Sequence, residues 1–232
     1  MTTSYQPSPE IRSAIIKMSD EYDIVTATED DKERIAEFLR KYFFTESPVR
    51  VASGASPNQR TDEIVGLKYL SQGASLLAVS KDDGRILGVA INYHTTPKDN
   101  DSEQSFTKSL SNNPHAKFAR FVENNANIWD VTGADRGLYN YAVSVDPAVR
   151  IRGIAKALAV RGREVARSMG YPMIWVRCTN LYSIRICRDM GMDAVYRIPY
   201  SEYKDEEGKP IFNVAHPHTE CVVFAQKLKS KL

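Results

Sequence analysis

The chain has 232 residues, of which 42% are hydrophobic, so it can bury an ordinary core in one large domain or two small ones. Its 31 basic and 29 acidic residues leave a formal net charge of +2, which gives no reason to expect nucleic acid or a membrane as a partner. Apolar runs fall short of the ~20 residues that span a bilayer, the first residues lack a secretory-signal pattern, and three cysteines without metal-site spacing indicate free thiols in a reducing compartment.

The first elements are predicted to be a strand and an amphipathic helix. Residues 1–20 are polar and mixed in character, so we expect a lead-in segment there. Residues 22–28 favour a strand, and Thr28 can cap the helix that follows. We expect this helix to end before Pro48. Its apolar side chains recur at i, i+3, i+4 and i+7, namely at Ile35, Phe38, Leu39 and Tyr42.

The segment that leaves this helix combines aromatic and acidic side chains, in Phe43-Phe44-Thr45-Glu46-Ser47-Pro48. Aromatic faces beside a carboxylate could bind an aromatic amine. The same residues could equally be core phenylalanines beside a solvated acid. Both interpretations remain open for this segment taken alone.

The middle of the chain is predicted to contain a helix, a hairpin and a further helix. The first helix covers residues 61–70. Apolar runs at 75–80 and 86–93 flank an Asp-Gly turn, which predicts a β-hairpin. The polar stretch 94–113 indicates a surface loop or flap, and helical spacing resumes over 114–129.

The most regular part of the chain alternates strands and helices. The expected order is a strand over 138–145, a turn, a long helix to about Met169, a strand over 173–178, a short helix containing Ser183, and strands over 194–200 and 220–228. This order predicts an α/β (α+β) fold with a mixed central sheet flanked by helices. No repeat, linker or change of composition divides residues 21–229, so we expect a single domain.

The turn before the long helix has features of a phosphate-binding site. Its pattern R-x-x-G-x-A, from Arg150 to Ala155, puts a glycine where uncovered N–H groups and the helix dipole attract anions. Arg150 and Arg152 add full positive charges. The turn lacks the lysine of a nucleoside-triphosphate loop and the three glycines of a dinucleotide fingerprint. It therefore suits the pyrophosphate of another class of ligand.

A set of short motifs runs through residues 22–228. A strand V-S-V-D precedes R-x-x-G-x-A, and the second half adds the pattern Asn180, Ser183, Cys187, Gly191. Further motifs are Phe43-Phe44 with an acid before Pro48, Cys178-Thr179-x-x-Tyr182-Ser183, and Tyr203-Lys204 followed by Ala215-His216-Pro217-His218. The first pair resembles motif A and the N-x-x-A-x-x-x-Y-x-x-x-G segment of the GNAT superfamily of N-acetyltransferases. The whole set, in this order, resembles the insect-type arylalkylamine (dopamine-like) N-acetyltransferases.

The resemblance implies an enzyme that transfers the acetyl group of acetyl-CoA directly to a primary amine, without a metal. It implies a bulge near Val143-Ser144 whose backbone groups bind the pantetheine and polarise the thioester carbonyl. The residues implied for acetyl-CoA are Val143, Ser144, Val145, Arg150, Ile151, Arg152, Gly153, Ile154, Ala155, Lys156, Asn180, Tyr182 and Ser183. Those implied for the amine pocket are Phe43, Phe44 and His218.

The catalytic residues implied by the resemblance are Glu46, Ser47, Thr179 and Ser183. An alkylamine with a pKa of ~10 arrives protonated, so a base or a water chain must remove its proton. In the insect-type enzymes a glutamate directly before the proline is that base, whereas this chain has Ser47 there and Glu46 one residue earlier. Glu46 could swing in, water could relay the proton, or activity could be weak. Cys187 replaces the superfamily's tyrosine, so Ser183 is the expected proton donor to the departing thiolate. The alternative is that Ser183 is only a small residue that packs a helix against a strand.

Three hypotheses about function follow. The first is a small-molecule arylalkylamine N-acetyltransferase. The second is an enzyme that accepts a polyamine, an amino acid or a protein lysine; acids lining the acceptor cleft would favour polycations, and aromatics would favour tryptamine- or dopamine-like amines. The third is a catalytically weak acyl-CoA-binding protein, because Ser47 stands in the base position. A covalent route through Cys178 or Cys187 is disfavoured because buried thiols are usually inert, and His216 with His218 offers too few ligands for a metal.

The last three residues, Ser230-Lys231-Leu232, match a peroxisomal address that an import receptor reads. A solvated basic tail is the alternative interpretation. We expect a peroxisomal or cytoplasmic protein with acetyl-CoA and a small amine as ligands. Monomer and dimer both remain open.

Overall fold

The computed structural model describes residues 21–98 and 113–228. The predicted lead-in over 1–20, most of the predicted loop over 94–113 and the tripeptide 230–232 lie outside this part of the chain. The peroxisomal address therefore stays a prediction. In the described part, no helix combines the length and the apolar character that crossing a membrane requires.

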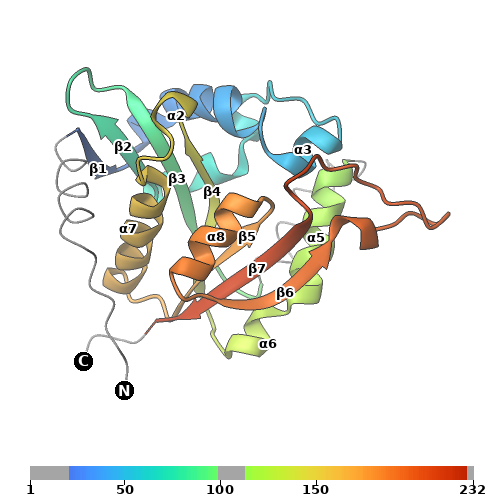
Figure 1. Cartoon of the computed structure of the whole chain (residues 1–232). Coiled ribbons are helices and arrows are strands. Elements are labelled where there is room, and N and C mark those ends of the chain that lie inside the picture. The colour runs from blue at the N-terminus through green and yellow to red at the C-terminus, as the bar shows by residue number, and fades with distance from the viewer. Residues whose placement is uncertain (1–20, 99–112, 229–232) are drawn as a thin grey trace.

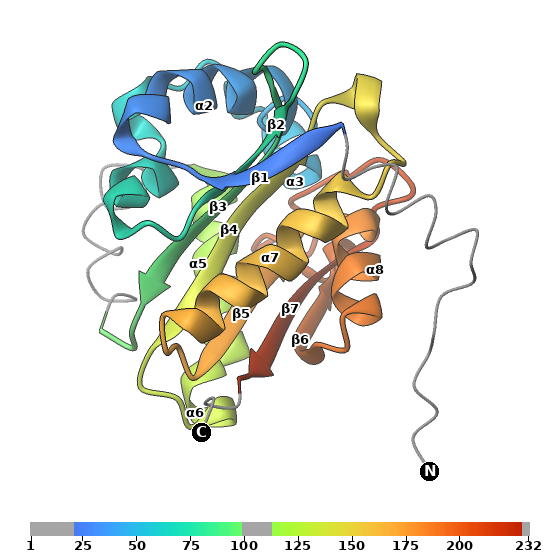
Figure 2. The same ribbon diagram turned by 90° about the vertical axis from the view of Figure 1, so that its left-hand side faces the viewer.

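The fold is built on one seven-stranded sheet with the order β1-β2-β3-β4-β5-β7-β6 (Figures 1 and 2). Neighbouring strands are antiparallel except β4 and β5, which are parallel. The strands are β1 (Tyr22–Thr26), β2 (Leu76–Ser80), β3 (Ile86–Thr95), β4 (Gly137–Val145), β5 (Met173–Cys178), β6 (Asp193–Pro199) and β7 (Glu220–Lys227). The predicted mixed sheet and each of its predicted strands are confirmed, with bounds that differ by a few residues.

Helices cover both faces of the sheet (Figure 2). The α-helices of the described chain are α2 (Lys32–Phe38), α3 (Pro48–Ala52), α5 (Pro114–Ala126), α6 (Ile128–Thr132), α7 (Ile154–Ser168) and α8 (Leu181–Asp189). Alternation along β7 shows the two faces, because side chains of a strand point to opposite sides in turn. Val222 and Phe224 pack in the cluster that contains α7 and α8 residues, whereas Val223 and Ala225 pack with α5.

Several short helical turns connect these elements: η1 (Glu29–Asp31), η2 (Leu39–Phe43), η3 (Thr61–Glu63), η4 (Val65–Gln72), η5 (Pro147–Val149) and η6 (Tyr200–Glu202). The helix predicted over 61–70 is therefore two 3-10 segments, η3 and η4. The exit predicted before Pro48 is only half right. The first helix does end there, but Pro48 then begins α3, since proline suits the first position of a helix, where no partner for its nitrogen is needed.

The parallel pair β4 and β5 separates partway along its length. The two strands pair from Leu138↔Ile174 to Asn140↔Val176. The pairing ends there, although β4 continues to Val145 and β5 to Cys178. Beyond Asn140, the edge of β4 that faces β5 has no strand partner in the described chain. This separation opens the cleft described below.

The bulge expected near Val143-Ser144 lies earlier, at Tyr141. Ile91 pairs with Ala142 and Asn92 with Asn140, so Tyr141 is the extra residue on β4. An amide pair stabilises this register, because Asn140 Nδ2 donates to Oδ1 of the buried Asn92 at 2.7 Å. The extra residue reverses the alternation of side chains along β4. Val143 therefore packs on the α7 side of the sheet.

Candidate functional site

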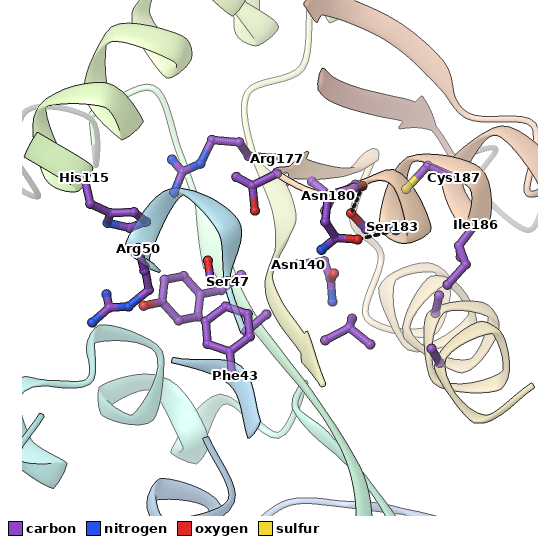
Figure 3. A pocket seen from close by; sticks show the side chains of 17 residues that line it. Phe43, Ser47, Arg50, His115, Asn140, Arg177, Asn180, Ser183, Ile186 and Cys187 are labelled. Atoms are coloured by element: carbon purple, nitrogen blue, oxygen red, sulfur yellow. Dashed lines mark hydrogen bonds between the residues drawn. The ribbon is translucent and has the colours of Figure 1, made fainter. Parts of the chain in front are cut away.

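A cleft of about 780 Å³, counted with its open mouth, lies where β4 and β5 separate (Figure 3). Its lining comes from the segment after α2, from α3, from both separated strands, from the start of α5, and from α7 and α8. One end is formed by α8 and small residues of α7, including Ala155 and Ala159. The other end is formed by aromatic and basic side chains, including Phe43 and Tyr141.

Residues 150–155, which we call the phosphate turn, reach the cleft at Ala155. Gly153, the N-cap of α7, has a left-handed backbone (φ 77°) that glycine adopts without a steric clash. No side chain caps α7 there, so its first N–H groups are available to an anion. Ile151 has a positive φ of 69° and a fully exposed side chain. Strain of this kind is typical of ligand-binding turns.

The basic side chains in and beside the phosphate turn are paired with carboxylates of other elements. Arg152 Nη1 lies 2.9 Å from Glu21 Oε2, and Lys156 Nζ lies 3.6 Å from Asp189 Oδ2. All four side chains are about half exposed. Pairs of this kind contribute only about 0–1 kcal/mol, so a phosphate group can take the place of either carboxylate.

The loop between β5 and α8 carries three predicted residues to the cleft, Thr179, Asn180 and Ser183. Figure 3 shows the last two. Asn180 caps α8, because its Oδ1 accepts a hydrogen bond from Ser183 N at 2.8 Å. Ser183 Oγ donates to the Asn180 carbonyl at 2.9 Å. The carbonyl of Thr179 accepts from the Tyr200 hydroxyl at 2.6 Å. These bonds hold the loop in one arrangement, with a serine hydroxyl at the cleft.

Two residues predicted for the site, Tyr182 and His218, lie outside the cleft lining. His218 Nδ1 accepts a hydrogen bond from Leu181 N at 3.2 Å, and its ring meets the Tyr182 ring edge-on. Burial, and then the neighbouring His216, lower the pKa of His218, which favours the neutral imidazole that can accept this bond. His218 thus helps to fix the start of α8.

The predicted residues of β4 and the start of α7 divide between cleft and core. Val143 lines the cleft. Ser144 and Val145 are buried and pair with β3. Ile154 is also buried, in the core beneath α7.

An irregular helix exit brings Phe43 and Ser47 to the cleft. The π-helical turn η2 closes with a bond from Phe44 N to Leu39 O at 2.8 Å, and such turns are frequent at functional sites. Ser47 is only 8% exposed and lines the cleft (Figure 3). Phe44 is buried in the core, so one aromatic of the motif faces the cleft and the other does not.

Glu46 is not among the residues that line the cleft. Its carboxylate forms an ion pair with Arg150 Nη2, and its side chain is 44% exposed. Arg150 also donates from Nε to the Val145 carbonyl at 3.2 Å. Of the two residues considered for the base position, Ser47 lies at the cleft and Glu46 lies at the phosphate turn.

Sequence patterns alone do not identify five polar or aromatic residues of the lining: Arg50, His115, Asn140, Tyr141 and Arg177. A signal for the arginines exists, because each interrupts an apolar run, in P-V-R-V-A and M-I-W-V-R-C. A charge in a segment that should be buried needs a reason. Asn140 and Tyr141 gave no comparable signal, since their place depends on the bulge.

Arg50, His115 and Arg177 form what we call the basic end of the cleft (Figure 3). Arg177 forms an ion pair with Glu123 of α5, whereas Arg50, only 5% exposed, has no carboxylate within 4.0 Å in the described chain. Burial, together with Arg177 and Arg50, lowers the pKa of His115 to about 3, so this imidazole is neutral near pH 7.

The described residues that line the cleft include no aspartate or glutamate. Within residues 21–98 and 113–228, no group of three or more His, Cys, Asp or Glu could hold a metal ion. The thiols of Cys178 and Cys187 lie 3.5 Å apart and are buried. Hydrogen bonding with Cys187, then burial, raise the pKa of Cys178. A protonated thiol of this kind is a poor nucleophile.

Comparisons with known proteins agree with this geometry. Residues 32–192 match the profile of the acetyltransferase (GNAT) family. The fold is similar to that of arylalkylamine N-acetyltransferase 2 from Aedes aegypti, with a TM-score of 0.82, 23% identity, and coverage of 90% of this chain and 99% of that one. It is also similar to a mosquito arylalkylamine N-acetyltransferase-like protein, 5b (TM-score 0.80, 18% identity, 89% and 100% covered). The Drosophila melanogaster polyamine N-acetyltransferase, which forms N-acetylagmatine, is similar too (TM-score 0.79, 19% identity, 90% and 100% covered).

Proposed function

The chain belongs to the acetyltransferase (GNAT) family, and from this premise we propose that it transfers the acetyl group of acetyl-CoA to the nitrogen of a small arylalkylamine. The observation that carries the proposal is the separation of β4 and β5. It opens a cleft that reaches the phosphate turn at one end and aromatic side chains at the other.

The residues around the cleft fit acetyl-CoA. The N–H groups at the start of α7 and the guanidinium of Arg150 would hold the pyrophosphate. Beyond Asn140 no strand of the described chain pairs with the β5-facing edge of β4, so backbone groups of this edge could bind an extended chain such as pantetheine. The small side chains of Ala155 and Ala159 leave room beside it. Once bound, this cosubstrate supplies the reactive acetyl thioester.

Ser47 is the residue that we assign to proton removal. The amine must lose a proton before its lone pair can attack the acetyl carbon. Ser47 lies at the cleft in the position before the proline, whereas Glu46 is held by Arg150. We therefore expect the Ser47 hydroxyl and water to relay the proton to solvent.

Ser183 serves the other half of the reaction. The amine nitrogen bonds to the carbonyl carbon, the C–S bond breaks, and the thiolate takes up a proton. Ser183 Oγ lies at the cleft beside Asn180 and can donate to the departing sulfur, with the Thr179 hydroxyl on the same loop. Direct transfer fits better than an acetyl-cysteine intermediate, because burial and the Cys187 contact keep Cys178 protonated.

The lining of the cleft favours an aromatic acceptor over a polyamine. Phe43 and Tyr141, with ring centroids 6.4 Å apart, give it an aromatic wall. Arg50, whose charge no described carboxylate balances, would repel a polycation, and no described lining residue is acidic. A protein lysine and a free amino acid are the alternative acceptors.

A panel of amines with acetyl-CoA, followed by release of free thiol, tests the proposal. We expect tyramine, tryptamine or a close relative to react well above the rate with water, and spermidine to react poorly. Ser183→Ala should lower kcat about tenfold or more, while Ser168→Ala, an exposed serine at the end of α7, should not. Thiol release no faster than the water reaction for every amine would leave an acyl-CoA-binding protein as the better description.

A further inference from the structure

Arg50 is a buried cation with an unused donor. Its side chain is 5% exposed, and its Nε has no hydrogen-bond partner in the described chain. Nη2 donates to the Ser56 carbonyl at 3.3 Å, and the guanidinium lies over the Phe44 ring at 4.4 Å. These contacts orient the guanidinium and leave its charge without a counter-ion among the described residues. A buried charge in this state is costly unless something pairs with it.

Several other features make the same region favourable for an anion. Arg177, His115 and Arg50 all line this end of the cleft. Arg177 keeps its own carboxylate, Glu123, so that pair is neutral as a whole. His115 is the second residue of α5, a thirteen-residue helix whose positive end therefore lies here as well. The neutral imidazole of His115 can donate one hydrogen bond.

We propose that Arg50 binds a carboxylate carried by the acceptor, so that the substrate is an aromatic amine that also bears an acid group. This inference rests on the proposed function, because it concerns the acceptor end of the same cleft. The planar guanidinium matches a carboxylate in shape and charge. The aromatic wall of Phe43 and Tyr141 would contact the ring of the same molecule.

Matched pairs of acceptors test the proposal on the unmodified protein. Tyramine and tyrosine differ by an α-carboxylate, and 2-phenylethylamine and 4-(2-aminoethyl)benzoic acid differ by a carboxylate at the far end of the ring. We expect one carboxylated member to exceed its neutral partner in kcat/KM by about tenfold or more, as a charge-assisted hydrogen bond allows. The pair that shows the preference places the carboxylate relative to the amine. Equal or better rates for both neutral members would overturn the proposal, while leaving the N-acetyltransferase itself intact.

Variants of Arg50 assign the preference to this side chain. Arg50→Gln should bring the ratio within the preferred pair close to one, and Arg50→Lys should keep part of it. Arg161→Gln, which removes an exposed arginine of α7 paired with Glu164, is the matched control and should leave the ratio unchanged. A ratio that survives Arg50→Gln contradicts the assignment.

A binding measurement separates this proposal from catalysis. Calorimetry with 3-(4-hydroxyphenyl)propionate and with its methyl ester compares a charged and a neutral ligand that cannot be acetylated on nitrogen. The acid should bind about tenfold more tightly than the ester, and Arg50→Gln should remove the difference. Equal binding of acid and ester to the unmodified protein would overturn the inference even if every amine is acetylated. Preferential binding of the acid without acetylation of any amine would instead reject the proposed function alone.

Discussion

Glu46 and Arg150, 104 positions apart in the chain, form an ion pair between the helix exit and the phosphate turn. Arg150 is oriented for this contact by its second bond, from Nε to the Val145 carbonyl. The same guanidinium is the one that a pyrophosphate on the turn would need. We therefore expect Glu46 and the nucleotide to compete for Arg150, so that Glu46 affects the binding of the cosubstrate and takes no part in proton removal from the amine.

Replacing Glu46 by glutamine should tighten the binding of CoA. The pair is half exposed, and such pairs contribute about 0.2–1 kcal/mol, so the Kd should fall by a factor of about 1.4 to 5. Since Glu46 does not line the cleft, kcat should stay within about twofold of the unmodified value. Calorimetry with CoA and steady-state rates give both numbers, and Glu164→Gln, on the outer face of α7, is the control. A loss of kcat of about a hundredfold would show instead that Glu46 is the base.

Introducing a carboxylate at Ser47 should speed up the reaction. In Ser47→Glu the new side chain would start from a position that already lines the cleft, near the basic end, and general-base catalysis contributes about 10²–10⁴-fold. We expect kcat to rise by about tenfold or more, with a new acid limb in its pH profile. Ser47→Ala should lower kcat, and Ser53→Ala, just beyond α3, should not. A Ser47→Glu enzyme slower than Ser47→Ala would contradict the assignment of Ser47.

The stability of the protein should depend on pH through His115. Its pKa is about 3 in the folded chain, against 6.5 for an ordinary histidine, so the unfolded chain binds the extra proton between these values. Stability is therefore complete above pH 6.5 and falls as the pH decreases towards 3. Between pH 7.5 and 4.5 the chain should lose about 2 to 3 kcal/mol that the His115→Gln variant does not lose. Urea unfolding of both proteins across this range provides the measurement, and parallel curves would disprove the shift.

Two glycines should respond in opposite ways to alanine. A Cβ on Gly66 of η4 would lie 2.5 Å from Ile91 Cγ2 and 3.0 Å from Tyr141 Cδ1, so Gly66→Ala must displace Ile91 and press on Tyr141, the residue at the bulge. We expect a loss of about 1–3 kcal/mol of stability and a higher KM for the amine. A Cβ on Gly162 of α7 would lie 3.6 Å from the Asn92 amide, an ordinary contact. Gly162→Ala should gain up to about 1 kcal/mol from helix propensity. Thermal unfolding of both variants measures these changes in stability. Equal changes in the two variants would contradict the packing described around the two glycines.

The order of strands and helices could be predicted because it depends on local patterns. The Asp83-Gly84 turn, the period of two in the strands and the period of 3.6 in α2 and α7 act within a few residues. The loop from Thr179 to Ser183 is set locally as well, by the Asn180 cap of α8. The predicted strands agree with the structure, and the predicted loop residues lie at the cleft, while their roles stay predictions.

The features that differ depend on contacts between distant residues. The bulge at Tyr141 follows from the amide pair of Asn92 and Asn140, which are 48 positions apart. Arg50 and His115 line the same cleft because α3 and the start of α5 both lie beside it, and no periodicity within either segment indicates that. The orientation of Glu46 depends on a guanidinium 104 positions away. Short motifs identify residues that belong together, but side-chain direction is settled by such tertiary partners.

The ion pairs around the phosphate turn also determine which anions can bind there. Arg150, Arg152 and Lys156 each already hold one carboxylate of the chain. Chloride or a single carboxylate would gain little binding free energy by displacing one of these carboxylates, because one negative charge would only replace another. A pyrophosphate carries several linked negative charges. Once one of its phosphates has displaced a carboxylate from one cation, displacement at the next cation is intramolecular and therefore favoured. We therefore expect the turn to bind pyrophosphate in preference to small monovalent anions, so that these anions do not block the binding of the nucleotide.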